Sequence, residues 1–112
     1  MSTTKVAIAA DGQQVSAHFG RCEGYVVATV EDGRVVAQTW VANPGHEPGR
    51  LPMLMRELGV GCLVTGGIGP RAVEMLSEGG IQVLAGISGG IEQVLEEFAA
   101  GRLTGAENPC EH

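Results

Sequence analysis

The sequence predicts a single α/β domain, in which a mixed five-stranded sheet has helices on its faces. Three observations support this fold class. The second half of the chain alternates apolar runs with segments of helical periodicity, and this alternation requires parallel strands joined by right-handed crossovers. The first half contains a β-hairpin, whose two strands are antiparallel. The 112 residues are 44% hydrophobic and 18% charged, which is an ordinary composition for one globular core.

The first half of the chain is predicted to form three strands. Residues 5–10 are a short apolar run closed by an Asp-Gly turn signal, which indicates a strand buried on both faces. Residues 24–30 and 35–41 are rich in β-branched and aromatic side chains. The Asp-Gly pair within residues 31–34 is typical of a hairpin turn, so the second strand should run antiparallel to the third.

The second half is predicted to form three helices and two strands. Apolar positions three or four residues apart, with glycine near the end, predict helices at residues 51–58, 70–77 and 91–100. Short apolar runs before the second and third helices predict strands at residues 62–65 and 81–85. A glycine-rich turn joins each of these strands to the helix that follows it.

Domain organisation and charge narrow the functional classes. We expect one domain over residues 1–103 and a flexible tail over residues 104–112, where no periodicity is present. The formal net charge is −6 and the basic residues are scattered, so nucleic acid is not an expected partner. No window approaches the roughly 20 apolar residues of a membrane span, and the N-terminus lacks a signal-peptide core. We therefore expect a cytoplasmic protein with reduced cysteines and no membrane contact.

Two glycine-rich turns are candidate anion-binding sites. Residues 66–70 and residues 86–90 each follow a predicted parallel strand, and ligands of open α/β sheets bind at the carboxyl ends of strands. The free N–H groups of such a turn and the positive end of the next helix both favour an anion. The candidate residues are Gly66, Gly67, Gly69, Arg71, Gly89 and Gly90. The alternative is that these glycines only permit sharp turns.

The loop after the first strand brings together side chains of a second kind. It contains, in sequence, His18, Phe19, Gly20, Arg21 and Cys22. Imidazole and thiol groups are metal ligands, and a guanidinium group binds anions through paired hydrogen bonds. We expect the aromatic ring to pack this loop down and the loop to share a sheet edge with the glycine turns. The alternative is a polar loop with an inert cysteine.

The remaining chemistry-bearing residues are few. Cys110 and His112 form a C-x-H tail that suits a soft or borderline metal, but two ligands cannot close a tetrahedral site. Cys62 lies in an apolar run and is expected to be a buried small hydrophobe. No motif supplies a nucleophile with its base, or the paired carboxylates of a two-metal nuclease. We therefore expect no catalytic centre.

Four segments in this order and spacing resemble the dinitrogenase iron–molybdenum cofactor biosynthesis family. They are residues 15–21 (VSAHFGR), residues 43–45 (NPG), residues 66–72 (GGIGPRA) and the stretch over residues 79–103. The resemblance extends over nearly the whole chain. It implies a ribonuclease-H-like α/β layout with strand order 3-2-1-4-5. It also implies binding or carrying of iron–molybdenum cofactor or its iron–sulfur precursors, and a related group is associated with molybdenum–copper sulfide clusters.

The resemblance also implies where a cluster would bind and which proteins would exchange it. By position, the ligand region of the family corresponds to His18, Arg21 and the turn at residues 66–69. Cys22 follows the basic residue where many members have an aliphatic or small residue, so it adds a thiol to that region. The expected partners are metallocluster donor and acceptor proteins. The alternative function is a metal-free regulatory or interaction module that binds a phosphate-bearing ligand or a protein partner at the glycine turns.

Overall fold

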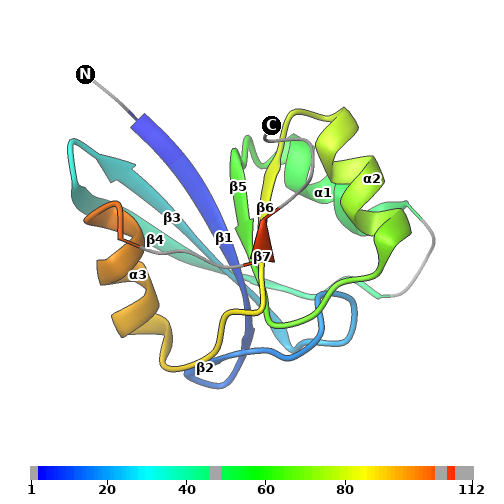
Figure 1. Ribbon diagram of the computed structural model, residues 1–112, viewed down its shortest axis with the longest axis horizontal. Helices are drawn as coiled ribbons and strands as arrows, with labels where there is room; N and C mark the ends of the chain where they lie inside the picture. The colour runs from blue at the N-terminus through cyan, green and yellow to red at the C-terminus, as the bar shows by residue number, and fades with distance from the viewer. Residues whose placement is uncertain (1–2, 46–48, 103–105, 108–112) are drawn as a thin grey trace.

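The computed structural model describes residues 3–45, 49–102 and 106–107 of the 112-residue chain. The strands are β1 (Thr3–Asp11), β2 (Gln14–Val15), β3 (Gly24–Glu31), β4 (Arg34–Ala42), β5 (Cys62–Val64), β6 (Gln82–Ala85) and β7 (Ala106–Glu107). The helices are α1 (Arg50–Glu57), α2 (Pro70–Glu78) and α3 (Ile91–Ala99). The predicted α/β class, with three helices and a mixed sheet, is therefore confirmed (Figure 1).

The strands form one sheet in the order β4-β3-β1-β5-β6-β7, and the short strand β2 pairs with β1. The hairpin strands β3 and β4 are antiparallel to each other, and β3 is antiparallel to β1. Strands β1, β5 and β6 are parallel, as the strand–helix alternation predicts. The five predicted strands thus have the predicted order and directions. The ribonuclease-H-like classification stays a prediction.

The predicted strand number is wrong, because the path through the sheet contains six strands and not five. The additional strand is β7, which pairs antiparallel with β6 through Leu84↔Glu107 and Ala85↔Ala106. It falls within residues 104–112, where we expected only a flexible tail. Without it, β6 would end the sheet with unpaired backbone N–H and C=O groups. Two residues are too short to show a periodic pattern, so the sequence carries no signal for this strand.

Each face of the sheet has its own apolar core, because β1 is buried on both sides. Val6, Ile8 and Ala10 pack with the buried residues of α3, whereas Ala7 and Ala9 pack with those of α1 and α2. All five side chains are fully buried, which explains the unbroken apolar run in this strand. The result is a three-layer arrangement with α3 on one face and with α1 and α2 on the other (Figure 1).

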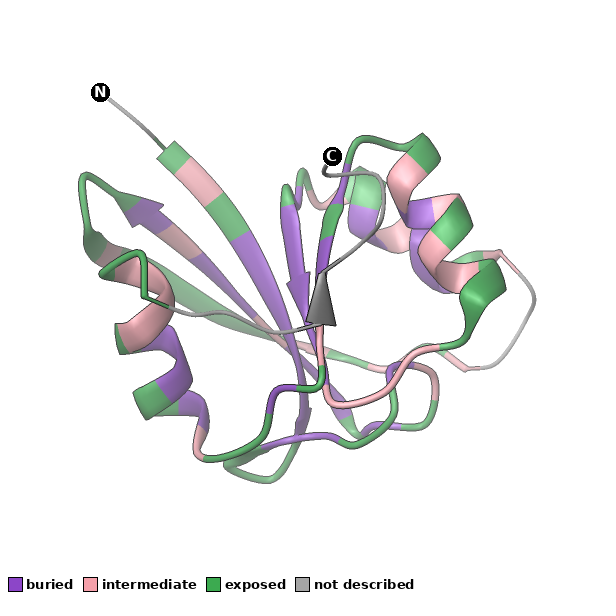
Figure 2. Ribbon diagram, viewed as in Figure 1, coloured by how far each residue is buried: buried purple, intermediate pink, exposed green. Residues whose placement is uncertain are grey.

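Strand β4 forms the other edge of the sheet and is mainly exposed (Figure 2). Val36 and Trp40 on this strand have exposed fractions of 53% and 49%. The indole lies across Gly24 of β3, where an added Cβ would stand 2.5 Å from Trp40 Cζ2. Glycine at this position therefore lets the aromatic ring cover the adjacent strand. Among the described helices, none is long and apolar enough to cross a membrane.

Candidate functional site

A cavity of about 760 Å³ lies on the face of the sheet that α1 and α2 cover. Three segments line it: the loop at residues 17–21, the start of α1 from Gly49 to Pro52, and the β5–α2 turn with the first half of α2. The loop and the turn follow β1 and β5, whose carboxyl ends lie side by side because these two strands are parallel. This is the sheet edge at which the sequence predicts a ligand.

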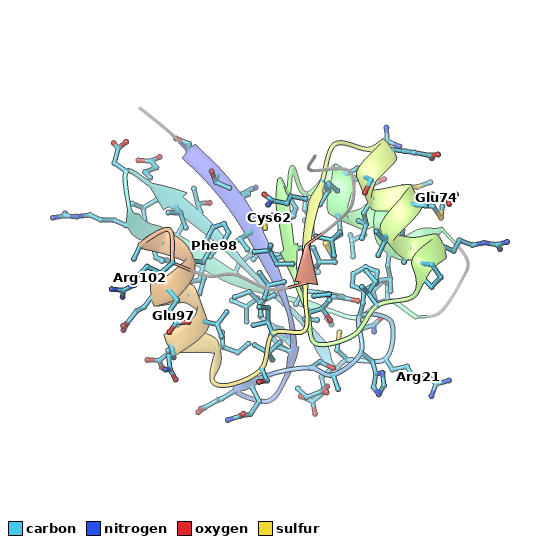
Figure 3. The ribbon with its side chains drawn as sticks, in the orientation of Figure 1. Arg21, Cys62, Glu74, Glu97, Phe98 and Arg102 are labelled. Carbon is cyan, nitrogen blue, oxygen red and sulfur yellow. The ribbon has the colours of Figure 1, made fainter. Side chains whose placement is uncertain are left out.

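The cavity is lined by two cationic arginines, and no carboxylate lies among the described residues there. His18, Arg21 and Arg71 contribute the polar groups, and all three residues are exposed. Their side chains form no hydrogen bond or ion pair with the described part of the chain. Figure 3 shows Arg21 extending from the loop on the side of the molecule where α2 lies. These groups are therefore available to a ligand, and the local charge favours an anion.

The rest of the lining is apolar. Phe19 and Leu51 are buried, while Ile68, Ala72 and Met75 are partly exposed toward the cavity they line. The thioether of a methionine is polarisable and adapts to irregular shapes. The cavity therefore combines a soft, apolar wall with a cationic rim, which suits a ligand that is anionic but weakly hydrated.

Two helices begin at this cavity, and neither has an acidic residue in its first turn. Gly49 caps α1, and Gly69 caps α2 with Pro70 as the first helical residue. Proline suits that position because its missing N–H would have no partner within the helix. The positive ends of both helix dipoles thus add to the charge of the arginines, each by about 0.3–1 kcal/mol for an exposed anion.

The glycines of the β5–α2 turn have two different roles. A Cβ on Gly66 would lie 2.8 Å from Ala17 Cα, and a Cβ on Gly67 would lie 2.6 Å from the Ala17 carbonyl oxygen. These two glycines allow the turn to pack directly against the loop, where Gly66 N donates to Ser16 O at 2.8 Å. By contrast, a Cβ on Gly69 would meet nothing within 4 Å. Gly69 therefore leaves open space at the cavity.

The second glycine turn does not join this site. It leads into α3, which packs on the opposite face of the sheet, and its residues do not line the cavity. Its backbone and the start of α3 are paired with β2 and the residue before it, because Val15 N donates to Gly89 O at 2.9 Å and Ile91 N donates to Gln13 O at 2.8 Å. Gly89 has a φ of 115°, which favours glycine for conformational reasons alone. Gly89 and Gly90 thus lie apart from the other predicted ligand-binding residues.

Cys22, which the sequence predicts as a metal ligand, is not placed at the cavity. Cys22 is 4% exposed and does not line it; its Sγ donates to Phe19 O at 3.4 Å. Burial raises the pKa of the Cys22 thiol above its ordinary value, which disfavours the thiolate that binds metal. Cys62 is buried in β5, as expected. Cys110 and His112 lie outside the described residues.

No cluster of three or more His, Cys, Asp or Glu side chains that could hold a bare metal ion occurs among the described residues. The site therefore offers no complete ligand set of its own within that part of the chain. The site offers the positive charge of its arginines, backbone N–H donors at the helix starts, and an apolar wall that includes the polarisable thioether of Met75. Such a site suits an anion that arrives with its own ligands.

Two residues that support this site were not predicted from the sequence. Tyr25 donates its hydroxyl to Phe19 O at 2.6 Å, and its ring contacts that of Phe19 at 5.7 Å between centroids. Asn43 donates from Nδ2 to Gly20 O and to Cys22 O, at 3.2 and 2.9 Å. The Asn-Pro-Gly motif marked Asn43 as notable without indicating what it contacts, and nothing local marked Tyr25 at all.

The protein is a small layered α/β domain with a cavity at its strand ends, and the described lining of this cavity contains two arginines and no carboxylate. The family model described as dinitrogenase iron-molybdenum cofactor matches residues 3–101. The chain therefore belongs to the dinitrogenase iron-molybdenum cofactor family, as the resemblance in the sequence predicts.

Similar proteins agree with this assignment in length and fold. MJ0580 of Methanocaldococcus jannaschii, an uncharacterized protein, is 28% identical over 104 residues, which cover 88% of each chain. The crystal structure of PH0822 superposes with a TM-score of 0.84 at 36% identity, over 90% of this chain and 93% of that one. The apo form of the orange protein from Desulfovibrio gigas gives a TM-score of 0.76 at 26% identity, over 95% of each chain.

Proposed function

We propose that the protein binds an anionic metal–sulfur cluster in the cavity between α1, α2 and the loop at residues 17–21, and carries it during cofactor biosynthesis. The cluster is cargo: iron–molybdenum cofactor, one of its precursors, or a molybdenum–copper sulfide cluster. The protein exchanges it with donor and acceptor proteins and has no catalytic centre of its own. Membership of the cofactor family supports this general role.

The observation that supports this function most strongly is a pair of arginines, Arg21 and Arg71, whose side chains have no partner among the described residues and which line a cavity with no carboxylate in its described lining. A bare metal cation would be repelled there, whereas a sulfide-rich anion would be attracted. The volume of about 760 Å³ accommodates a polynuclear species and is generous for a single phosphate. Polarisable sulfide also suits the apolar wall formed in part by Met75 and Ile68.

Within this site, His18 is the described residue able to coordinate a metal directly from the lining. Arg21 and Arg71 offset the negative charge from two sides of the cavity, one from the loop and one from α2. The amides at the start of α2 add donors that do not depend on a side chain. Each contribution is modest, so affinity depends on several of them acting on one anion.

The test is an anaerobic titration with tetrathiomolybdate, with and without Cu(I), followed by desalting and metal analysis. We expect retained visible absorption in the wild type and a loss of affinity of about 10- to 100-fold in Arg21→Ala or Arg71→Ala, since a hydrogen bond to a charged group contributes about 1.5–3 kcal/mol. Arg34→Ala, on the edge strand β4, is the matched control and should bind like the wild type. Metal-free wild-type protein after desalting would contradict the proposal.

The alternative, a metal-free module for a phosphate-bearing ligand, is favoured by one feature. The α2 N-terminus opens directly onto the cavity beside Arg71, as in sites that bind phosphate. Thermal shifts with phosphate and nucleotides, compared with thiomolybdate, separate the two functions. Stabilisation by nucleotides alone would favour the alternative.

A further inference from the structure

The Asn-Pro-Gly motif at residues 43–45 follows β4 in the sequence and does not line the cavity. Asn43 directly follows the end of β4, and its backbone N–H donates to Glu23 O at 3.1 Å. It is therefore joined by its backbone to the residue that precedes β3, at the open end of the β3–β4 hairpin. Gly49 and the start of α1 form one wall of the cavity.

The side chain of Asn43 reaches the opposite wall, which is the loop that contains His18 and Arg21. Its two Nδ2 hydrogens are matched by two backbone acceptors, Gly20 O at 3.2 Å and Cys22 O at 2.9 Å. Its Oδ1 accepts from Gly45 N at 2.9 Å, which fixes the orientation of the amide group. Only a side-chain amide offers two donors and an acceptor in this geometry. An aspartate would place a carboxylate against two carbonyl oxygens.

Tyr25 supports the same loop from the buried side. Its hydroxyl is fully buried with the rest of the residue and donates to Phe19 O at 2.6 Å. The two supports thus hold the carbonyl groups of Phe19, Gly20 and Cys22, and a Cβ on Gly20 would meet nothing within 4 Å. The side chains of His18 and Arg21 are exposed, so the order of this part of the loop depends on the packing of Phe19 and on these backbone hydrogen bonds.

We infer that Asn43 and Tyr25 are positioning residues for the ligand, which they never touch, and that they keep the loop at residues 18–21 ordered before the cargo arrives. This inference rests on the proposed function for the identity of the cargo. Affinity for a ligand falls in proportion to the population of the binding-competent state. Loss of either support therefore weakens binding by lowering that population, while every group that contacts the ligand remains.

The experiment compares Asn43→Asp and Tyr25→Phe with the wild type, using the full chain. Amide hydrogen exchange without ligand is followed at His18 and Phe19, whose N–H groups donate to Ser16 Oγ at 3.1 Å and to Gly67 O at 2.9 Å. We expect exchange to accelerate about tenfold at these amides, on the scale of one lost hydrogen bond, and not in β1 or β5. Affinity for tetrathiomolybdate should fall by about the same factor.

Gln38→Glu is the matched control, because it makes the same amide-to-carboxylate change on an exposed position of β4. It should alter neither loop exchange nor affinity. If Asn43→Asp does not fold, Tyr25→Phe decides the question, since it keeps the ring and removes only the hydroxyl donor. Unchanged loop exchange and affinity in the folded variants would overturn the inference. A third outcome separates the two ideas. If the wild type binds no thiomolybdate but loop exchange is faster in the variants, the two residues order the loop and the proposed function is wrong.

Discussion

At the scale of single residues, neighbouring glycines in one turn serve packing and access separately. Gly66 and Gly67 stand against the backbone of Ala17, whereas Gly69 faces open space at the cavity. The sequence shows all three as one glycine-rich motif and cannot separate these roles, because the contact with Ala17 joins segments far apart in the chain. The same limit applies to the hydrogen bonds of Asn43, which span 21 and 23 residues.

Gly69→Val is expected to damage ligand binding more than folding. Gly69 has φ −75° and ψ 155°, an extended conformation that a β-branched residue adopts easily, also before proline. The new side chain would occupy the open space at the α2 N-terminus, where an anion approaches the amides. Thiomolybdate titration and thermal melting together check this, and undiminished binding would show that the ligand lies elsewhere.

Gly66→Val serves as the contrasting variant in the same turn. Its Cβ would overlap the backbone of Ala17, which cannot move without breaking the bond from Gly66 N to Ser16 O. We expect a loss of about 1–3 kcal/mol in the free energy of unfolding, measured in urea. Equal stability of the two variants would mean that the close approach is not required.

The buried thiol of Cys22 and the buried hydroxyl of Tyr25 predict how the stability of the fold responds to alkaline pH. Burial is the main cause that raises the pKa of Cys22 above its ordinary value of 9.0, and it also raises the pKa of Tyr25 far above the usual range. The folded state therefore favours their protonated forms, and their contribution to stability is complete below about pH 9. We expect the free energy of unfolding to fall as the pH rises beyond that value. Cys22→Ala should lessen this fall, and an unaltered pH profile in that variant would exclude Cys22 as a source.

At the scale of elements, strands with a run of three or more apolar residues were predictable from the sequence, and the two-residue strands were not. The five main strands followed from apolar runs, and their order agrees with the resemblance, because right-handed crossovers leave few arrangements for strand–helix alternation. Strand β7 was missed because two residues show no period, and its pairing partner is set by the free edge of β6. The separation of the two glycine turns was also missed, since the sequence does not state which sheet face each helix covers.

Truncation tests the contribution of β7. A chain that ends after Glu107 keeps the pairing of β7 with β6 and should melt close to the wild type. A chain that ends after Gly105 loses that pairing, and each lost backbone hydrogen bond costs about 0.5–1.5 kcal/mol. For a domain of this size, that corresponds to a fall of several degrees in Tm, about 4–8 °C for each kcal/mol. Identical melting of the two truncated chains would show that β7 adds nothing to stability.

At the scale of the whole molecule, the cationic cavity belongs to a chain with a formal net charge of −6. In about 0.01 M salt the Debye length is roughly 30 Å, which approaches the molecular extents of 34 × 33 × 24 Å. An incoming anion then feels the entire protein and is repelled. At about 0.15 M salt the screening distance shrinks to roughly 8 Å, so the anion senses only the nearby arginines. Salt of about 0.15 M therefore screens the long-range repulsion while leaving the local attraction, so an anion that binds here should bind more weakly at about 0.01 M salt than the two arginines alone would predict.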